Sequence, residues 1–144
     1  MKVYAVIDTN VLVSSLLTGR VDSPTVKVVK AISEGTLIPL YNEEIMREYD
    51  EVLHRKKFPF TEKRIRPVLA SIRAFGLAVN PSPTGEILPD MDDLVFYEVV
   101  MEKREDDAYL VTGNLRHFPP RDFIVTPAEM MALLESDGRN KPPF

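Results

Sequence analysis

The stretch KVYAVIDTNVLVSSL, residues 2–16, combines the patterns of a short strand, a turn and the start of a helix. Residues 3–7 are rich in β-branched side chains, which favour an extended strand. In the residues that follow, apolar side chains recur at spacings of three and four, as they do along one face of a helix. The polar residues Asp8, Thr9 and Asn10 lie between the two segments. The stretch therefore predicts a strand that ends on a carboxylate, where a helix begins.

The same alternation of strand and helix patterns continues along the chain. Further strands are expected at 36–41, 76–81, 108–112 and 123–126, and further helices at 24–33, 42–58, 62–75, 93–103 and 127–135. Parallel strands need long crossovers, so this order predicts a mostly parallel central sheet of about five strands covered by helices on both faces, a three-layer α/β/α sandwich. A length of 144 residues fits one domain. We expect that domain at 1–135 and a flexible, polar, proline-rich tail at 136–144.

Composition narrows the class of protein. A hydrophobic fraction of 44% with 28% charged residues is typical of a soluble globular chain, and no apolar run reaches the roughly 20 residues that span a bilayer. The start of the chain lacks a signal-peptide pattern, so we expect a cytoplasmic location and no membrane contact. The absence of cysteine excludes a thiolate metal site, which leaves oxygen ligands or the two histidines. The net charge of -4 argues against a protein coated in positive potential, but not against local basic clusters.

Asp8 follows the first strand, where the ligand site of an open parallel sheet is expected. Helix capping is an alternative role for Asp8, Thr9 and Asn10, because all three residue types accept hydrogen bonds from a helix start. One cap suffices for one helix, so we expect the Asp8 side chain to enter the crevice beyond the sheet.

A second acid is selected by helical rotation in the third expected helix. Glu48 lies about 85° from the centre of its apolar face, whereas Glu44 and Glu51 lie about 125° and 145° away. Glu48 is therefore the acid that most nearly faces inward. Its alternative role is that of a surface carboxylate paired with Arg47 or Lys57.

Three further acids, Asp90, Asp92 and Asp93, surround the start of the helix expected at 93–103. Helical rotation places Asp93 on the apolar side, where an unpaired carboxylate costs several kcal/mol unless a charge partner or a cation compensates. Capping of the helix accounts for Asp92, but three acids exceed what one cap requires.

Thr112 and Asn114 follow the fourth expected strand, in VTGNLRHF. An ordinary turn is the alternative for this segment, yet Asn114 can meet Asp8, Glu48 and Asp93 at one end of the sheet. Crowded carboxylates repel one another and raise one another's pKa, so such a group is sensible chiefly as a cage for a divalent ion.

Four fragments, in this order and over nearly the whole chain, resemble the PIN domain nucleases, and in particular the toxin components of bacterial toxin-antitoxin systems. The fragments are VIDTNVLVSSL, EEIMREYDEVLHRKKF, LPDMDDLVFYEVV and AYLVTGNLRHFP. The resemblance implies an α/β/α sandwich and hydrolysis of RNA phosphodiester bonds with Mg²⁺ or Mn²⁺ held by three or four acids. It also implies a small antitoxin protein as partner and a homodimer.

Matched position by position, the resemblance implies as metal ligands the three acids that geometry selects: Asp8, Glu48 and Asp93. The fourth acid of many PIN domains falls at Asn114, whose neutral oxygen weakens a second metal site. Asp90 or Asp92 can compensate, and the choice among the three acids of DMDD stays open.

The remaining roles follow from position. We expect Thr112 and Asn114, with Asn10, to orient a water or a carboxylate beside the metal. Arg116, His117 and Arg121 are expected to hold the RNA backbone, and the basic cluster at 54–58 is a more distant candidate. A solvated surface is the alternative for these basic residues, and His117 is also a candidate general base.

Three other functions are alternatives to a nuclease. A phosphoacceptor receiver domain needs an Asp after its third strand and a Lys near its fifth, where the chain reads NPSPTG and FIVTP. A phosphatase with two aspartates spaced by one residue needs a second Asp where Asn10 stands. The stronger rival is a PIN-fold domain that has lost catalysis and serves as an RNA-binding or protein-interaction module.

Overall fold

The computed structural model describes residues 2–139, and within them five strands form one parallel sheet in the order β3-β2-β1-β4-β5. The strands are β1 (Val3–Ile7), β2 (Leu37–Tyr41), β3 (Leu77–Ala78), β4 (Tyr109–Val111) and β5 (Ile124–Val125). This order confirms the predicted parallel sheet of about five strands. It also makes β1 the central strand, so Asp8 emerges at the middle of the carboxyl edge.

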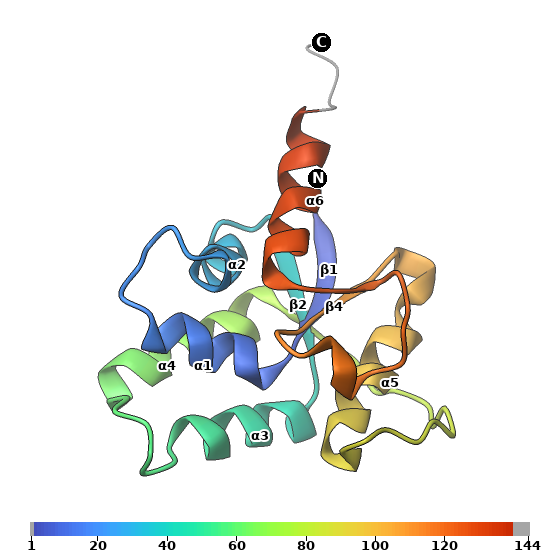
Figure 1. Ribbon diagram of the computed structural model, residues 1–144, viewed down its shortest axis with the longest axis horizontal. Helices are drawn as coiled ribbons and strands as arrows, with labels where there is room; N and C mark the ends of the chain where they lie inside the picture. Colours follow the sequence, from blue (N-terminus) through green and yellow to red (C-terminus); the bar gives the residue numbers. More distant parts are fainter. Residues whose placement is uncertain (1, 140–144) are drawn as a thin grey trace.

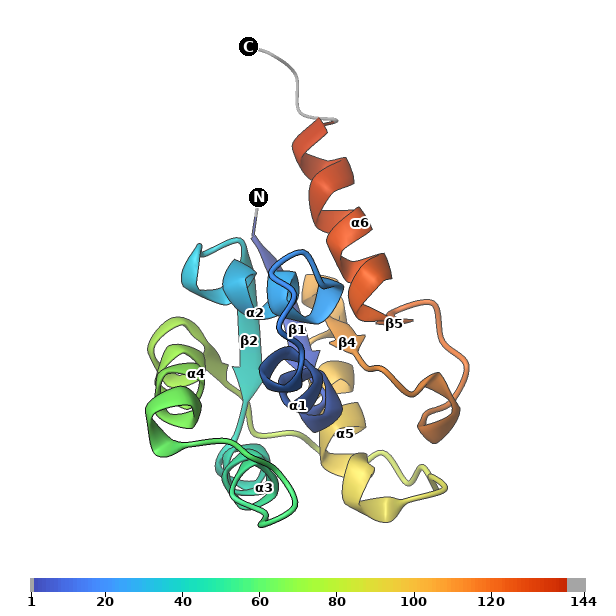
Figure 2. The ribbon, with the colours of Figure 1, turned by 60° about the vertical axis from the view of Figure 1, so that its left-hand side comes forward.

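Six α-helices within the same residues cover the sheet in layers. They are α1 (Thr9–Leu17), α2 (Pro24–Ser33), α3 (Glu43–Leu53), α4 (Glu62–Phe75), α5 (Leu94–Glu102) and α6 (Pro127–Arg139). Figure 1 shows α1, α2 and α4 on one side of the strands and α5 on the other, and Figure 2 shows α3 beyond the carboxyl end of β2. The predicted α/β/α sandwich is therefore confirmed. None of the helices in this part of the chain is long and apolar enough to cross a membrane.

The central strand is buried because helices cover both of its faces. Ala5, Val6 and Ile7 are fully buried, which explains why this segment reads as a continuous apolar run and not as an alternating one. Beyond the strand, Asp8 N–H donates to the Val111 carbonyl at 2.9 Å. The register thus carries Asp8 and Thr112 to the same edge, side by side.

Several boundaries differ from those predicted. The third helix ends at Leu53 instead of continuing to residue 58. Pro59 disfavours helical geometry at Phe58, and the Phe58 ring stacks on that of Phe60 with centroids 5.2 Å apart, so this segment forms a turn. The third strand shrinks to Leu77–Ala78.

The last helix also departs from the expected domain boundary. α6 continues to Arg139, so the first residues of the predicted 136–144 tail are helical. Residues 140–144 lie outside the described part of the chain.

Candidate active site

A cavity of about 320 Å³ lies beyond the carboxyl end of β1. Side chains from α1, α3, the turn before α5 and the loop after β4 line it together with Asp8. The lining residues are Asp8, Thr9, Asn10, Val13, Glu48, Val52, Arg55, Phe58, Asp90, Asp92, Asp93 and His117. All three predicted acids, together with their two alternatives in DMDD, therefore face one cavity.

Asp8 is 4% exposed and stands at the N-cap position of α1, but its side chain does not cap the helix. Its Oδ2 instead accepts hydrogen bonds from Thr112 Oγ1 at 2.8 Å and from Asn10 Nδ2 at 3.1 Å. Burial raises the pKa of Asp8, and these hydrogen bonds offset part of that increase. The capping alternative for Asp8 is thus excluded by its contacts.

Thr112 and Asn10 form hydrogen bonds that link the end of β1 to the end of β4 beside Asp8. The Thr112 hydroxyl accepts from the Asn114 N–H at 2.9 Å while it donates to Asp8. Asn10 Oδ1 accepts from the Gly113 N–H at 3.1 Å while its Nδ2 donates to Asp8. Both side chains therefore orient the Asp8 carboxylate.

Glu48 on α3 reaches the cavity through a contact with α1. The Thr9 hydroxyl donates to Glu48 Oε2, and within the described residues neither Arg47 nor Lys57 pairs with Glu48. Burial raises the pKa of Glu48 to about 7, and the negative charge of Asp8 and Asp93 raises it as well. At neutral pH this carboxyl is partly protonated in the absence of a cation.

Asp93 ends the 3-10 turn Met91–Asp93 immediately before α5, and its side chain is 13% exposed. Its Oδ2 is buried with no hydrogen-bond partner. His117 Nδ1 lies 3.1 Å from this oxygen, at ion-pair distance but outside hydrogen-bond geometry. Burial, then the charge of Asp8, raises the pKa of Asp93 to about 6.

The other acids of DMDD have roles that differ from those expected. Asp90, not Asp92, caps the turn, because Asp90 Oδ1 accepts from the Asp92 N–H at 3.0 Å. Asp92 lines the cavity as an exposed carboxylate. Capping therefore accounts for Asp90 and leaves Asp92 and Asp93 available to the cavity.

Asn114 acts on His117 in addition to its backbone contact with Thr112. Asn114 Nδ2 lies 2.9 Å from His117 Nε2. An amide nitrogen only donates, so Nε2 accepts and the proton of a neutral ring sits on Nδ1, the nitrogen nearer Asp93. Asn114 thus positions the imidazole between two site residues.

The donor set fits a hard divalent cation, although no three carboxylate or imidazole side chains in the described part of the chain stand in a ready metal-binding arrangement. The carboxylates of Asp8, Glu48 and Asp93 supply oxygen ligands, the type that Mg²⁺ and Mn²⁺ prefer. The Oδ2 of Asp93 has no hydrogen bond, and burial raises the pKa of all three acids, so a cation in the cavity would favour their charged forms. The hydrogen bonds from Thr9 and Thr112 each use one oxygen of Glu48 and Asp8, so the second oxygen of each carboxylate is available to a cation.

The basic residues are distributed differently from the prediction. His117 lines the cavity, whereas Arg116 and Arg121 line a separate pocket beside it. Within the cluster at 54–58, Arg55 and Phe58 line the cavity itself, so this cluster is nearer than expected. Sequence reasoning missed Phe58 as a lining residue because the expected helix continued through it.

Comparison with known proteins identifies the family. A sequence profile of the PIN domain matches residues 4–116, so the chain belongs to the PIN domain family, whose members are generally nucleases. It is 27% identical over 117 residues to an uncharacterized protein of Methanocaldococcus jannaschii, covering 79% of this chain and 72% of that protein. No solved structure matches the chain significantly.

Proposed function

We propose that the chain is a metal-dependent endoribonuclease that hydrolyses RNA phosphodiester bonds. The observation that carries the proposal is the meeting of Asp8, Glu48 and Asp93, from three separate elements, on one cavity at the carboxyl edge of the sheet. Separate elements deliver carboxylates to one place at an electrostatic cost, which the raised pKa values record. A divalent cation removes that cost.

The three carboxylates would hold Mg²⁺ or Mn²⁺. A bound ion of this kind polarises a phosphate oxygen and lowers the pKa of a bound water. Thr112 and Asn10 orient Asp8 toward the cavity, and Thr9 orients Glu48. His117, held by Asn114, faces the same cavity and can move a proton or contact a phosphate.

Asp8→Asn tests the proposal. The substitution removes the most buried charge of the cluster and keeps its shape, so divalent-dependent cleavage of RNA should fall by at least about a hundredfold. The fold should persist or gain stability, because the repulsion among the carboxylates is relieved. Asp22→Asn, at a 68% exposed side chain between α1 and α2, is the matched control. Undiminished cleavage by purified Asp8→Asn protein would overturn the mechanism.

Finer features of the proposal rest on the family resemblance. The chain would act as the toxin of a toxin-antitoxin pair in the cytoplasm, as a homodimer silenced by a small antitoxin protein. Growth arrest on expression that depends on intact Asp8, relieved by the product of a neighbouring short reading frame, would support this role. Normal growth under strong expression of the active protein would count against it.

The rival proposal is a catalytically degenerate PIN domain that binds RNA or protein. Two observations favour it: Asn114 stands at the position of a fourth acid, and the described carboxylates are not preassembled around an ion. A degenerate site should show no divalent binding that depends on Asp8, whereas the nuclease should show it.

A further inference from the structure

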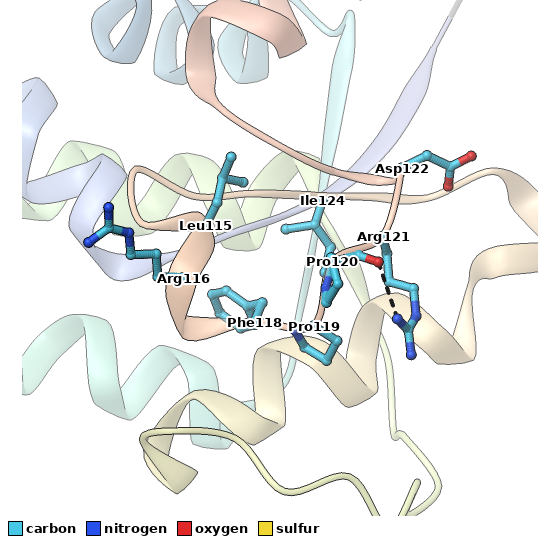
Figure 3. A pocket seen from close by; sticks show the side chains of 8 residues that line it. All are labelled: Leu115, Arg116, Phe118, Pro119, Pro120, Arg121, Asp122 and Ile124. Carbon is cyan, nitrogen blue, oxygen red and sulfur yellow. Dashed lines mark hydrogen bonds between the residues drawn. The ribbon is translucent and has the colours of Figure 1, made fainter.

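A pocket of about 610 Å³ lies beside the carboxylate cavity, in the loop that connects β4 to β5. It is formed by one short segment, and Figure 3 shows Phe118, Pro119 and Pro120 close together while the Arg116 and Arg121 side chains extend away on opposite sides. The lining residues are Leu115, Arg116, Phe118, Pro119, Pro120, Arg121, Asp122 and Ile124. The pocket combines an apolar floor with an arginine at each side.

We propose that this pocket receives a nucleobase next to the scissile phosphate of a single RNA strand, with Arg116 contacting the adjoining phosphate. The proposal rests on the nuclease function above, which it deepens by assigning a substrate subsite. Three features favour this occupant: the chemistry of the walls, the connection to the carboxylate cavity and the different partners of the two arginines.

The walls suit a flat, weakly polar group with a charged neighbour. Leu115 is 44% exposed and Pro120 is exposed, so these two side chains offer apolar surface, whereas Phe118 is only 5% exposed and lies beneath them. Bases of any sequence stack on such surfaces and on guanidinium planes, whereas a duplex keeps its base faces covered. The Asp122 carboxylate points outward, away from Phe118 (Figure 3), so it does not charge the floor.

The pocket and the carboxylate cavity share a single turn of chain. Leu115–His117 is a 3-10 turn in which His117 faces the cavity while Leu115 and Arg116 face the pocket. An RNA strand whose phosphate lies at the carboxylates therefore passes close to the pocket. The base next to that phosphate would enter the pocket.

The two arginines differ in the hydrogen bonds and ion pairs that they already make. Arg121 lies 3.6 Å from Glu86 and donates to the Pro120 carbonyl at 3.2 Å. Arg116 is exposed and makes no ion pair or hydrogen bond within the described residues. A polyanion approaching a cluster of acids needs nearby positive charge, and Arg116 is a cation without a competing carboxylate.

Binding of labelled RNA to the Asp8→Asn protein without divalent ions tests this subsite apart from catalysis. The probes are fluorescein-labelled short oligoadenylate and an abasic strand with the same number of phosphates, followed by fluorescence anisotropy. Leu115→Ala should weaken oligoadenylate binding about fivefold and leave abasic binding unchanged. Arg116→Ala should weaken both, with a shallower salt dependence. Leu17→Ala, at the last residue of α1, and Arg20→Ala, in the loop that follows it, are the matched controls because both side chains are exposed.

The outcomes separate the subsite from the nuclease proposal. If Leu115→Ala leaves oligoadenylate binding unchanged, if it weakens both probes equally, or if the parent protein binds no RNA, the base subsite is wrong, even where Asp8-dependent cleavage holds. If binding depends on Leu115 and Arg116 but intact protein never cleaves RNA, the subsite stands and the proposed catalysis fails. Oligoadenylate binding that both controls weaken to the same degree would also overturn the subsite.

Discussion

The hydroxyl of Tyr49 donates a hydrogen bond to the backbone carbonyl of Ile7. Each partner is next in sequence to a site acid, since Tyr49 follows Glu48 and Ile7 precedes Asp8. The bond is buried and joins α3 to the end of the central strand. It therefore helps to fix the distance between the carboxylates of Glu48 and Asp8, which repel each other. Neither carboxylate takes part in the bond, so both stay available to a cation.

Tyr49→Phe should lower both stability and catalysis. The loss of a buried hydrogen bond costs about 1 kcal/mol, which lowers the melting temperature by about 3 °C for a chain of this size. Release of α3 from β1 should also reduce divalent-dependent cleavage. Tyr97→Phe is the control, because the buried Tyr97 makes no hydrogen bond within the described residues. Equal effects of the two substitutions would show that the Tyr49 bond has no special role.

Thr112→Val should impair the site while preserving the side-chain shape. It removes the donor to Asp8 Oδ2 and the acceptor for the Asn114 N–H, so the pKa of Asp8 should rise further. The pH profile of cleavage should then shift to higher pH. Thr112→Ser, which keeps the hydroxyl, should restore the original profile. A pH profile that stays fixed in Thr112→Val would contradict the assigned role.

The metal-free protein should lose stability as pH rises. A carboxyl whose pKa is raised on folding binds its proton more tightly in the folded state, so folding is favoured at low pH and the advantage fades between the unfolded and folded pKa values. For Glu48 that interval runs from 4.5 to about 7. Urea unfolding with a chelator present should show this decline, and Glu48→Gln should flatten it. Identical pH dependence in the two proteins would contradict the raised pKa of Glu48.

Asn114→Asp separates a working site from a degenerate one. The substitution adds a carboxylate beside His117 and should tighten divalent binding several-fold by charge alone. If the natural chain is a nuclease, cleavage already occurs with Asn114 and changes only modestly. If cleavage appears solely in the Asn114→Asp protein, the natural chain is the degenerate module.

The fold and the positions of the acids could be predicted from the sequence because both follow from the periodicity of apolar residues. The apolar run ending at Ile7, the rotation that turns Glu48 inward and the strand ending before Thr112 each depend on local spacing, and the structure places these residues at one edge of the sheet. Thr9 and Tyr49 escaped prediction as positioning residues because their partners are 39 and 42 residues away. Contacts at such separation leave no periodic signal.

Boundaries and caps were less predictable for a different reason. Asp90 and Asp92 are alike as cap residues, and only the turn geometry shows that Asp90 accepts the hydrogen bond. Arg116 and His117 are adjacent, yet the 3-10 turn directs one to the pocket and the other to the cavity. Sequence indicates which residue types lie near an edge, while the local turn decides which cavity each one faces.

Calorimetric titration with Mn²⁺, at a pH above the raised pKa of Glu48, tests the central claim most directly. The account predicts that the chain binds the ion, that Asp8→Asn, Glu48→Gln and Asp93→Asn each weaken binding at least about tenfold, and that Asp22→Asn does not. No binding by the unaltered chain, or binding that all four variants share equally, would contradict the claim that these three carboxylates form one cation site.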